Sequence, residues 1–234
     1  MNVAIITARG GSKRIPGKNI RNFFGKPMIT WPIGEALKSG LFSQIVVSTD
    51  SHEIAEVARQ YGAVTPFMRP PELSDDITPT APVLAHALKT LSEMGSSYKY
   101  ACCIYPTSPF MQSDDLKSAF NLLAESKAPM VYSVTSFPFP ILRAVKMQED
   151  GSVVFNWPEH EITRSQDLPE FYHDAGQFYW FDTDTFLQKP TLMPKGTRPY
   201  ILPRWRVQDL DTMEDWKNAE LMAKILLQEK GKNE

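Results

Sequence analysis

The chain has 234 residues, of which 42% are hydrophobic and 22% are charged, and its formal net charge is −2. This composition is ordinary for a soluble globular protein, and it lacks the positive charge typical of nucleic-acid binding. The length predicts a single domain over residues 1–234. The chain opens on a short apolar run rather than on a signal peptide, and no stretch reaches membrane-spanning length, so we expect a cytoplasmic protein.

Apolar strands and helices alternate through most of the chain. Short runs rich in β-branched or aromatic residues predict buried strands at 3–6, 44–49, 63–67, 100–105, 130–135, within 173–181 and at 200–202. Helical spacing of apolar residues predicts helices at 28–38, 50–62, 80–91, 113–123 and 212–227. Alternation of this kind is typical of parallel βαβ units.

Several local details follow from these elements. Asp50, Thr80 and Ser113 are predicted as N-caps of their helices. Cys102 and Cys103 are neighbours on one strand and point to opposite faces, so we interpret them as core thiols rather than as a disulfide or metal pair.

The alternation stops after residue 135. Residues 144–148 and 153–156 flank Glu149-Asp150-Gly151, which is a hairpin signal. Residues 157–173 have no clean period, and an irregular stretch of this length in a compact domain is usually functional.

The loop after the first strand carries the strongest chemical signal. Residues 7–19 read Thr-Ala-Arg-Gly-Gly-Ser-Lys-Arg-Ile-Pro-Gly-Lys-Asn, with four basic residues among them. Glycine lets backbone N–H groups approach an anion, and the cations neutralise it, so the expected ligand is a phosphate chain. The spacing does not fit a Walker A loop or a dinucleotide-binding G-x-G-x-x-G. The alternative is a solvated basic surface loop.

Residues 8–13 and 16–19 together resemble the first motif of the acylneuraminate cytidylyltransferases, which activate nine-carbon acidic sugars as CMP-sugars. The similarity extends over nearly the whole chain. It implies a three-layer α/β/α nucleotide-diphospho-sugar transferase fold with a mostly parallel sheet. It also implies that Arg9, Lys13 and Lys18 hold the triphosphate of CTP. Further nucleotide contacts are implied for Ala8, Gly10, Gly11, Ser12 and Asn19.

Residues 69–80 resemble the second motif of that family, which surrounds the nucleotide base. Arg69, Thr78 and Thr80 match positions that hold cytosine and ribose. The alternative is that this stretch only leads into a helix that Thr80 caps. At the carboxyl end of strand 100–105, Tyr105 stands where the family has glutamine, which leaves the amide contact of that position in doubt.

Near the C-terminus, Asp209 and Asp211 face the same way in an extended chain, while Leu210 points toward the core. Paired carboxylates beside phosphates suit Mg²⁺, which completes its shell with water and phosphate oxygens. The alternative is helix capping, which Thr212 and Asp215 satisfy but which does not explain Asp209. The family has Asp-x-Asp at this place.

The resemblance assigns the sugar pocket and the dimer contact to an excursion at residues 138–173. Arg164 matches an arginine that binds the sugar carboxylate, with a plain surface arginine as the alternative. His173 and Gln177 are candidate sugar contacts, although a histidine at a strand start is often structural. Six aromatic residues are expected around the pocket: Phe137, Phe139, Phe171, Tyr172, Phe178 and Trp180.

Together these motifs imply an enzyme that transfers CMP from CTP to the anomeric hydroxyl of an acidic nine-carbon sugar, with release of pyrophosphate and with Mg²⁺ as cofactor. Residues 174–177, Asp-Ala-Gly-Gln, point to the pseudaminic acid branch of the family. A homodimer is expected, without nucleic-acid or membrane partners. The alternatives are N-acetylneuraminate or Kdo as acceptor, or a non-catalytic nucleotide-binding domain, against which the intact cations and carboxylates argue.

Overall fold

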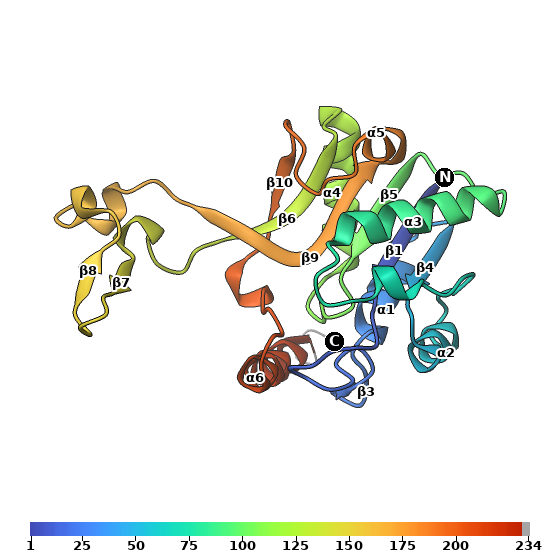
Figure 1. Cartoon of the computed structure of the whole chain (residues 1–234), viewed down its shortest axis with the longest axis horizontal. Helices are drawn as coiled ribbons and strands as arrows, with labels where there is room; N and C mark the ends of the chain where they lie inside the picture. Colours follow the sequence, from blue (N-terminus) through green and yellow to red (C-terminus); the bar gives the residue numbers. More distant parts are fainter. Residues whose placement is uncertain (231–234) are drawn as a thin grey trace.

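The computed structural model describes residues 1–230 and is built on one central sheet (Figure 1). Its six strands lie in the order β10-β6-β9-β5-β1-β4. Only β9 runs antiparallel to its neighbours β5 and β6, so the predicted, mostly parallel α/β sheet is confirmed. The strands are β1 Asn2–Thr7, β4 Gln44–Ser48, β5 Tyr100–Ile104, β6 Met130–Ser136, β9 Tyr172–Asp182 and β10 Arg198–Ile201.

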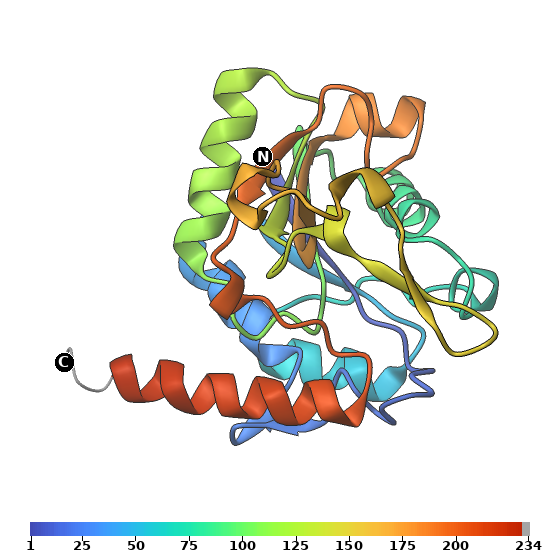
Figure 2. The ribbon, with the colours of Figure 1, turned by 90° about the vertical axis from the view of Figure 1, so that its left-hand side faces the viewer.

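Helices cover both faces of the sheet, which gives the expected three layers (Figure 2). One face packs against α1 (Thr30–Ser39), α2 (His52–Gln60) and α4 (Ser113–Ser126). The other packs against α3 (Thr80–Glu93) and α5 (Thr183–Gln188). Cys102 belongs to the first core and Cys103 to the second, because neighbouring strand residues point to opposite faces. Both thiols are free and buried, as predicted.

The last helix, α6 (Met213–Lys230), lies away from the sheet and packs against the N-terminal part of the chain. Trp216 contacts Phe23 edge to face, with ring centroids 5.5 Å apart. Phe23 belongs to a small hairpin of β2 (Asn22–Phe23) and β3 (Lys26–Pro27). This core brings the segment before α6 beside the loop after β1, although the two are nearly the whole chain apart.

Residues 137–171 form an arm that projects from the sheet (Figure 1). The predicted hairpin is present in it as β7 (Val145–Met147) and β8 (Val153–Phe155). Short 3₁₀ turns make up much of the rest: η2 Ile141–Arg143, η3 Pro158–His160 and η4 Ser165–Asp167. The long strand β9 returns the chain to the body. No helix within residues 1–230 combines the length and the apolar character needed to cross a bilayer.

Three N-cap predictions need correction. The N-cap of α3 is Pro79 and has no side-chain hydrogen bond, so Thr80 is the first helical residue and does not cap the helix. Ser51, rather than Asp50, is the N-cap of α2, and its side chain accepts from the Ile54 amide. α4 is capped by Gln112 in a capping box with Asp115, so Ser113 is its first helical residue.

The predicted strand 63–67 reduces to a single bridge between Val64 and Val46, and residues 65–67 do not pair with the sheet.

Candidate active site

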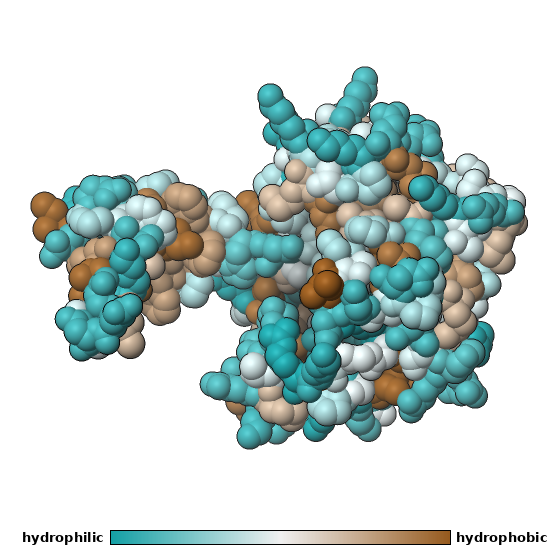
Figure 3. Space-filling view, in the orientation of Figure 1, coloured by the Kyte–Doolittle hydropathy of each residue, from teal (hydrophilic) through white to brown (hydrophobic). Residues whose placement is uncertain are grey.

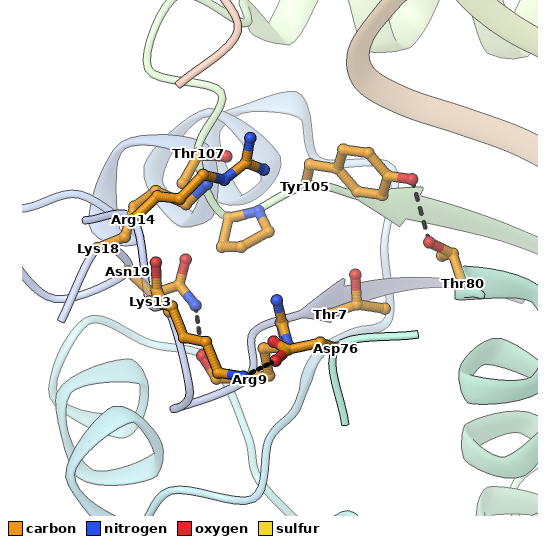
Figure 4. Close-up of a pocket in the computed structure, with 12 residues that line it drawn as sticks. Thr7, Arg9, Lys13, Arg14, Lys18, Asn19, Asp76, Thr80, Tyr105 and Thr107 are labelled. Carbon is orange, nitrogen blue, oxygen red and sulfur yellow. Dashed lines mark hydrogen bonds and ion pairs between the residues drawn. The ribbon is translucent and has the colours of Figure 1, made fainter. Parts of the chain in front are cut away.

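A cleft opens where β1 and β5 end, at the carboxyl edge of the sheet (Figure 4). Ligands of open α/β sheets bind outside this edge. The cleft encloses about 460 Å³ and is lined by Thr7, Arg9, Ser12, Lys13, Arg14, Lys18, Asn19, Asp76, Thr80, Tyr105, Pro106 and Thr107. The predicted phosphate loop therefore forms one wall of the cavity.

Glycine shapes this loop at two points. Gly17 adopts φ +63°, a left-handed conformation that other residues rarely take. A Cβ on Gly10 would lie 3.1 Å from the Ser51 Cβ, a tight contact, so glycine favours this close approach of the loop to the start of α2. The Gly10 amide donates to Asp50 Oδ1 at 2.8 Å. Asp50 thus anchors the loop instead of capping the helix.

Two of the four cations pair with one carboxylate of the loop before α3. Arg9 and Lys13 both form ion pairs with Asp76. Arg9 Nη1 also donates to the Asp75 carbonyl at 3.0 Å. Hydrogen bonds from Lys13 and Arg9 lower the pKa of the Asp76 carboxyl, which stays ionised.

The other two cations face the C-terminal carboxylates. Arg14 Nη2 lies 2.7 Å from Asp211 Oδ1, and these residues are 197 positions apart. Lys18 Nζ donates to the Leu210 carbonyl at 2.7 Å and lies 3.9 Å from Asp211 Oδ1. Burial lowers the pKa of Lys18, against the opposing charges of Asp211 and Asp209. The Lys18 side chain is only 21% exposed, so packing as well as charge holds it in place.

The carboxylate pair lies beside a fully buried Leu210, which belongs to the core under α6. Burial, followed by the charge of Asp211, raises the pKa of Asp209. Thr212 and Asp215 form reciprocal hydrogen bonds at the start of α6, so capping occupies Asp215 but leaves Asp209 unexplained.

Two nearby carboxylates that repel each other suit a divalent cation. Within the described residues, no group of three or more His, Cys, Asp or Glu side chains converges on one point. A magnesium ion held here would take one or two carboxylates and complete its shell with phosphate and water, which is its common arrangement. The donor set therefore fits Mg²⁺.

The opposite end of the cleft is uncharged (Figure 4). The hydroxyl oxygens of Thr80 and Tyr105 are 3.1 Å apart. Thr80 is the first residue of α3 and makes no side-chain capping bond, so its hydroxyl is available to this pair. Burial raises the pKa of Tyr105, whose ring packs 5.3 Å from that of Tyr179. Tyr105 thus fills the family's glutamine position with a phenol that stays protonated.

Five of the predicted nucleotide contacts do not line the cleft: Ala8, Gly10, Gly11, Arg69 and Thr78. Arg69 is 5% exposed and donates from Nε to Ser48 Oγ at 3.1 Å, with a second hydrogen bond to the Ser48 carbonyl. Burial lowers the pKa of Arg69 to about 10. The Thr78 hydroxyl donates to the Glu72 carbonyl at 3.3 Å. Both side chains hold the loop that carries Asp76.

The predicted sugar contacts are scattered. Arg164 lies on the arm and pairs with Asp167 at 2.8 Å. His173 Nδ1 is 2.8 Å from the Asp174 carbonyl, and its ring packs on Phe137. Gln177 is 3% exposed, and its Nε2 donates to the Arg206 carbonyl at 2.7 Å.

The placement of two aromatic residues in the sugar pocket is also wrong. Phe178 and Trp180 are fully buried within the core between the sheet and α4. Successive side chains of β9 point to opposite faces of the sheet, but helices cover both faces at this position. The remaining aromatic candidates lie on the arm or at its base: Phe137, Phe139, Phe171 and Tyr172.

Sequence reasoning left several cleft residues unassigned. Arg14 was visible in the basic cluster. Thr7, Asp76, Pro106 and Thr107 line the cavity because separate loops converge at the sheet edge. The sequence does not indicate that Asp76 pairs with cations of the phosphate loop, because these partners lie more than sixty positions away.

Comparisons with known proteins agree with this geometry. A family model described as cytidylyltransferase matches residues 3–225. The chain is 40% identical over 224 residues to the pseudaminic acid cytidylyltransferase of Campylobacter jejuni serotype O:2, covering 96% of this chain and 97% of that protein. It is 30% identical to the CMP-N,N'-diacetyllegionaminic acid synthase of Legionella pneumophila, covering 95% and 96% respectively.

Among solved structures, the chain resembles CMP:2-keto-3-deoxy-manno-octonic acid synthetase complexed with CTP, with a TM-score of 0.69. The match covers 95% of this chain and 98% of that one at 18% sequence identity. At this identity the likeness shows the shared fold alone.

Proposed function

The chain belongs to the cytidylyltransferase family, and from this premise we propose that it transfers CMP from CTP to the anomeric hydroxyl of pseudaminic acid. The sugar oxygen attacks the α-phosphorus, the bond to the β-phosphate breaks, the hydroxyl proton is lost, and pyrophosphate leaves. One observation carries the proposal: four cations of one loop line the cleft, and two of them, Arg14 and Lys18, pair with Asp211 of the Asp-x-Asp segment.

In this proposal the cations bind the triphosphate. Arg9, Lys13 and Lys18 line the cavity, and Arg14 joins them. Phosphoryl and nucleotidyl transfer require little covalent chemistry from the protein, so positioning and neutralisation of charge carry most of the catalysis. Cations at the β- and γ-phosphates stabilise the negative charge that develops on the leaving pyrophosphate.

We further propose that Asp209 and Asp211 hold Mg²⁺. When bound, the ion neutralises phosphate charge and lowers the pKa of a hydroxyl that it contacts. Lys18 links this site to the phosphate loop, because its ammonium group contacts the Leu210 carbonyl between the two carboxylates. The position of Lys18 supports the proposal that the triphosphate and the metal ion bind next to each other.

The hydroxyls of Thr80 and Tyr105 at the uncharged end suit the nucleoside or the sugar, whose hydroxyl and amide groups need hydrogen-bond partners rather than charges. Arg69 supports this end indirectly in the proposal, since it anchors the loop before α3 to the end of β4.

We propose that the arm mediates a homodimer. It exposes large apolar side chains in the described structure, among them Phe139 at 80% and Ile162 at 92% (Figure 3). Clustered exposed apolar groups mark interaction surfaces in soluble proteins. Because the arm projects away from the body that carries the cleft, Arg164 is better placed to serve the cleft of a second copy (Figure 1).

The test is a turnover assay with CTP, Mg²⁺ and a panel of acidic sugars: pseudaminic acid, N,N'-diacetyllegionaminic acid, N-acetylneuraminate and Kdo. Pyrophosphate release and the mass of the CMP-sugar are measured together. Product with pseudaminic acid supports the proposal. Product only with another sugar corrects the acceptor, and no product with any sugar while CTP still binds identifies a non-catalytic domain.

A further inference from the structure

Asp76 lies at the phosphate end of the cleft and has no part in the proposed chemistry. It belongs to the loop between η1 (Pro71–Leu73) and α3, and its carboxylate lies beside the side chains of Arg9 and Lys13 (Figure 4). Both cations form ion pairs with it. A negative group therefore occupies a position between two residues that are expected to bind phosphate.

The turn around Asp76 is held mainly by contacts that do not involve the cations. Asp75 Oδ1 accepts from the Ile77 amide at 3.1 Å and from the Thr78 amide at 2.6 Å. The Thr78 hydroxyl bonds back to the Glu72 carbonyl. Arg9 adds one contact from outside, to the Asp75 carbonyl. Because these bonds shape the loop, the Asp76 carboxylate remains near the cations when they change partners.

The four cations of the cleft thus form two pairs, and a different carboxylate partly neutralises each pair. Asp76 offers one negative charge to Arg9 and Lys13, and Asp211 offers one to Arg14 and Lys18. Asp209 adds a further carboxylate near Lys18, so four cations face three carboxylates and the site keeps a net positive charge that attracts a polyanion.

We propose that Asp76 is an internal anion that competes with ligand phosphate groups for Arg9 and Lys13. A nucleoside triphosphate or pyrophosphate carries several negative charges and displaces Asp76, but part of its binding free energy is lost in breaking the Asp76 ion pairs. The competition therefore weakens polyphosphate binding and assists release of pyrophosphate, an inference about these ligands that rests on the proposed function.

The expected effect is moderate because both ion pairs are partly exposed to water. Exposed pairs contribute little each, so removing the competitor tightens polyphosphate binding by about threefold to tenfold. The effect decreases as salt rises, because ions screen charges at the surface.

The experiment measures the Kd of the full chain for inorganic pyrophosphate and for CTP by isothermal titration calorimetry, without acceptor sugar. Asp76→Asn removes the competing charge and keeps the shape of the side chain. Glu72→Gln is the matched control: it removes one charge from the same loop, and within residues 1–230 the Glu72 side chain forms no hydrogen bond or ion pair. Thermal melts check that both variants are folded.

Tighter pyrophosphate binding by Asp76→Asn, about threefold to tenfold at low salt and smaller at high salt, supports the proposal, provided that Glu72→Gln changes the Kd less than twofold. An unchanged Kd means that Asp76 does not compete, and a weaker Kd means that Asp76 itself holds the ligand; either result overturns the proposal. An equal increase in pyrophosphate affinity in both variants also overturns the proposal, because the effect then comes from the net charge of the loop and not from Asp76.

The proposed function and the proposed role of Asp76 can be refuted independently of each other. Binding of pyrophosphate is measured without turnover, so an enzyme that accepts no acidic sugar can still show the Asp76 effect. Conversely, normal synthesis of the CMP-sugar by the wild-type protein with no gain in Asp76→Asn removes only the role of Asp76. A second readout is product inhibition by pyrophosphate, which is expected to be stronger in Asp76→Asn by a similar factor.

Discussion

Lys13 and Lys18 carry the same charge in the phosphate loop, but their surroundings differ. The Lys13 side chain is 82% exposed, and among the described residues Asp76 is its ion-pair partner. Lys18 is largely covered and donates to the Leu210 carbonyl at 2.7 Å. Lys18 therefore supports the fold, whereas Lys13 does not, and in the proposed function both bind the triphosphate.

Lys18→Ala and Lys13→Ala are both expected to lower CTP turnover, but only the first destabilises the protein. A buried hydrogen bond from a charged group contributes about 1.5–3 kcal/mol to the free energy of unfolding. An exposed surface substitution usually stays within about 0.5 kcal/mol. Urea denaturation and turnover per folded molecule separate the two effects. Full activity in folded Lys18→Ala would contradict its place in the phosphate site.

Asp209 and Asp211 are expected to be essential for turnover but not for folding. Asp209→Asn or Asp211→Asn removes a charge beside the proposed triphosphate, and losses of roughly a hundredfold or more are usual for such electrostatic roles. Asp114→Asn on α4 is the control, because Asp114 is exposed and pairs only with Lys117 in the described structure. Wild-type rates in both site variants would refute the metal proposal.

At the scale of elements, a buried ion pair connects α4 to the turn η5 (Arg204–Arg206). Arg206 forms two hydrogen bonds with the Asp115 carboxylate, at 2.5 and 2.9 Å, and both side chains are nearly buried. The Arg206 carbonyl accepts from buried Gln177 on β9. These contacts fix the chain three residues before Asp209, so they position the carboxylate pair relative to the sheet.

Breaking this pair is expected to destabilise the protein. Asp115→Asn or Arg206→Leu leaves a buried group without its partner, which costs about 3–5 kcal/mol of the free energy of unfolding. The double variant Asp115→Leu/Arg206→Leu recovers part of that loss, because it leaves no unpaired charge. Urea denaturation measures all three. Single variants as stable as the wild type would show that the pair does not hold η5 in place.

At the scale of the whole molecule, the arm decides whether the protein acts alone. The double variant Phe139→Asp/Ile162→Asp is expected to convert the proposed dimer to a monomer, since it places charges on the exposed apolar side chains. Sedimentation velocity gives the mass. Met94→Asp at the end of α3 is the control, an exposed apolar residue away from the arm. A monomeric wild-type protein would refute the dimer.

The acceptor is expected to be pseudaminic acid, with a higher kcat/KM than N-acetylneuraminate. The two acids share the carboxylate and the anomeric hydroxyl but differ in ring stereochemistry and at the terminal carbon, where pseudaminic acid has a methyl group. In the proposal, the exposed aromatic side chains of Phe171 and Tyr172 at the base of the arm contact that methyl group. An apolar pocket rejects an added hydroxyl by only about a hundredfold, so slow turnover of N-acetylneuraminate is compatible with the proposal. Equal kcat/KM values would contradict it.

Local patterns in the sequence were enough to predict the alternating strands and helices, the hairpin in the arm, and the opposite orientations of Cys102 and Cys103. These features depend on neighbouring residues, because the periods of helices and strands are properties of short segments. The phosphate loop and the Asp-x-Asp segment were visible for the same reason, since each is a contiguous motif.

Only the tertiary structure decided which side chains meet. Arg14 reaches Asp211 across 197 positions, Asp76 enters the cleft between Arg9 and Lys13, and Lys18 donates to Leu210. The local sequence pattern also could not predict which of these side chains are buried. Arg69, Gln177 and Trp180 were plausible ligand contacts by position, but packed elements enclose each of them. Long-range packing determines both outcomes, because the neighbours that cover or charge a side chain come from distant parts of the chain.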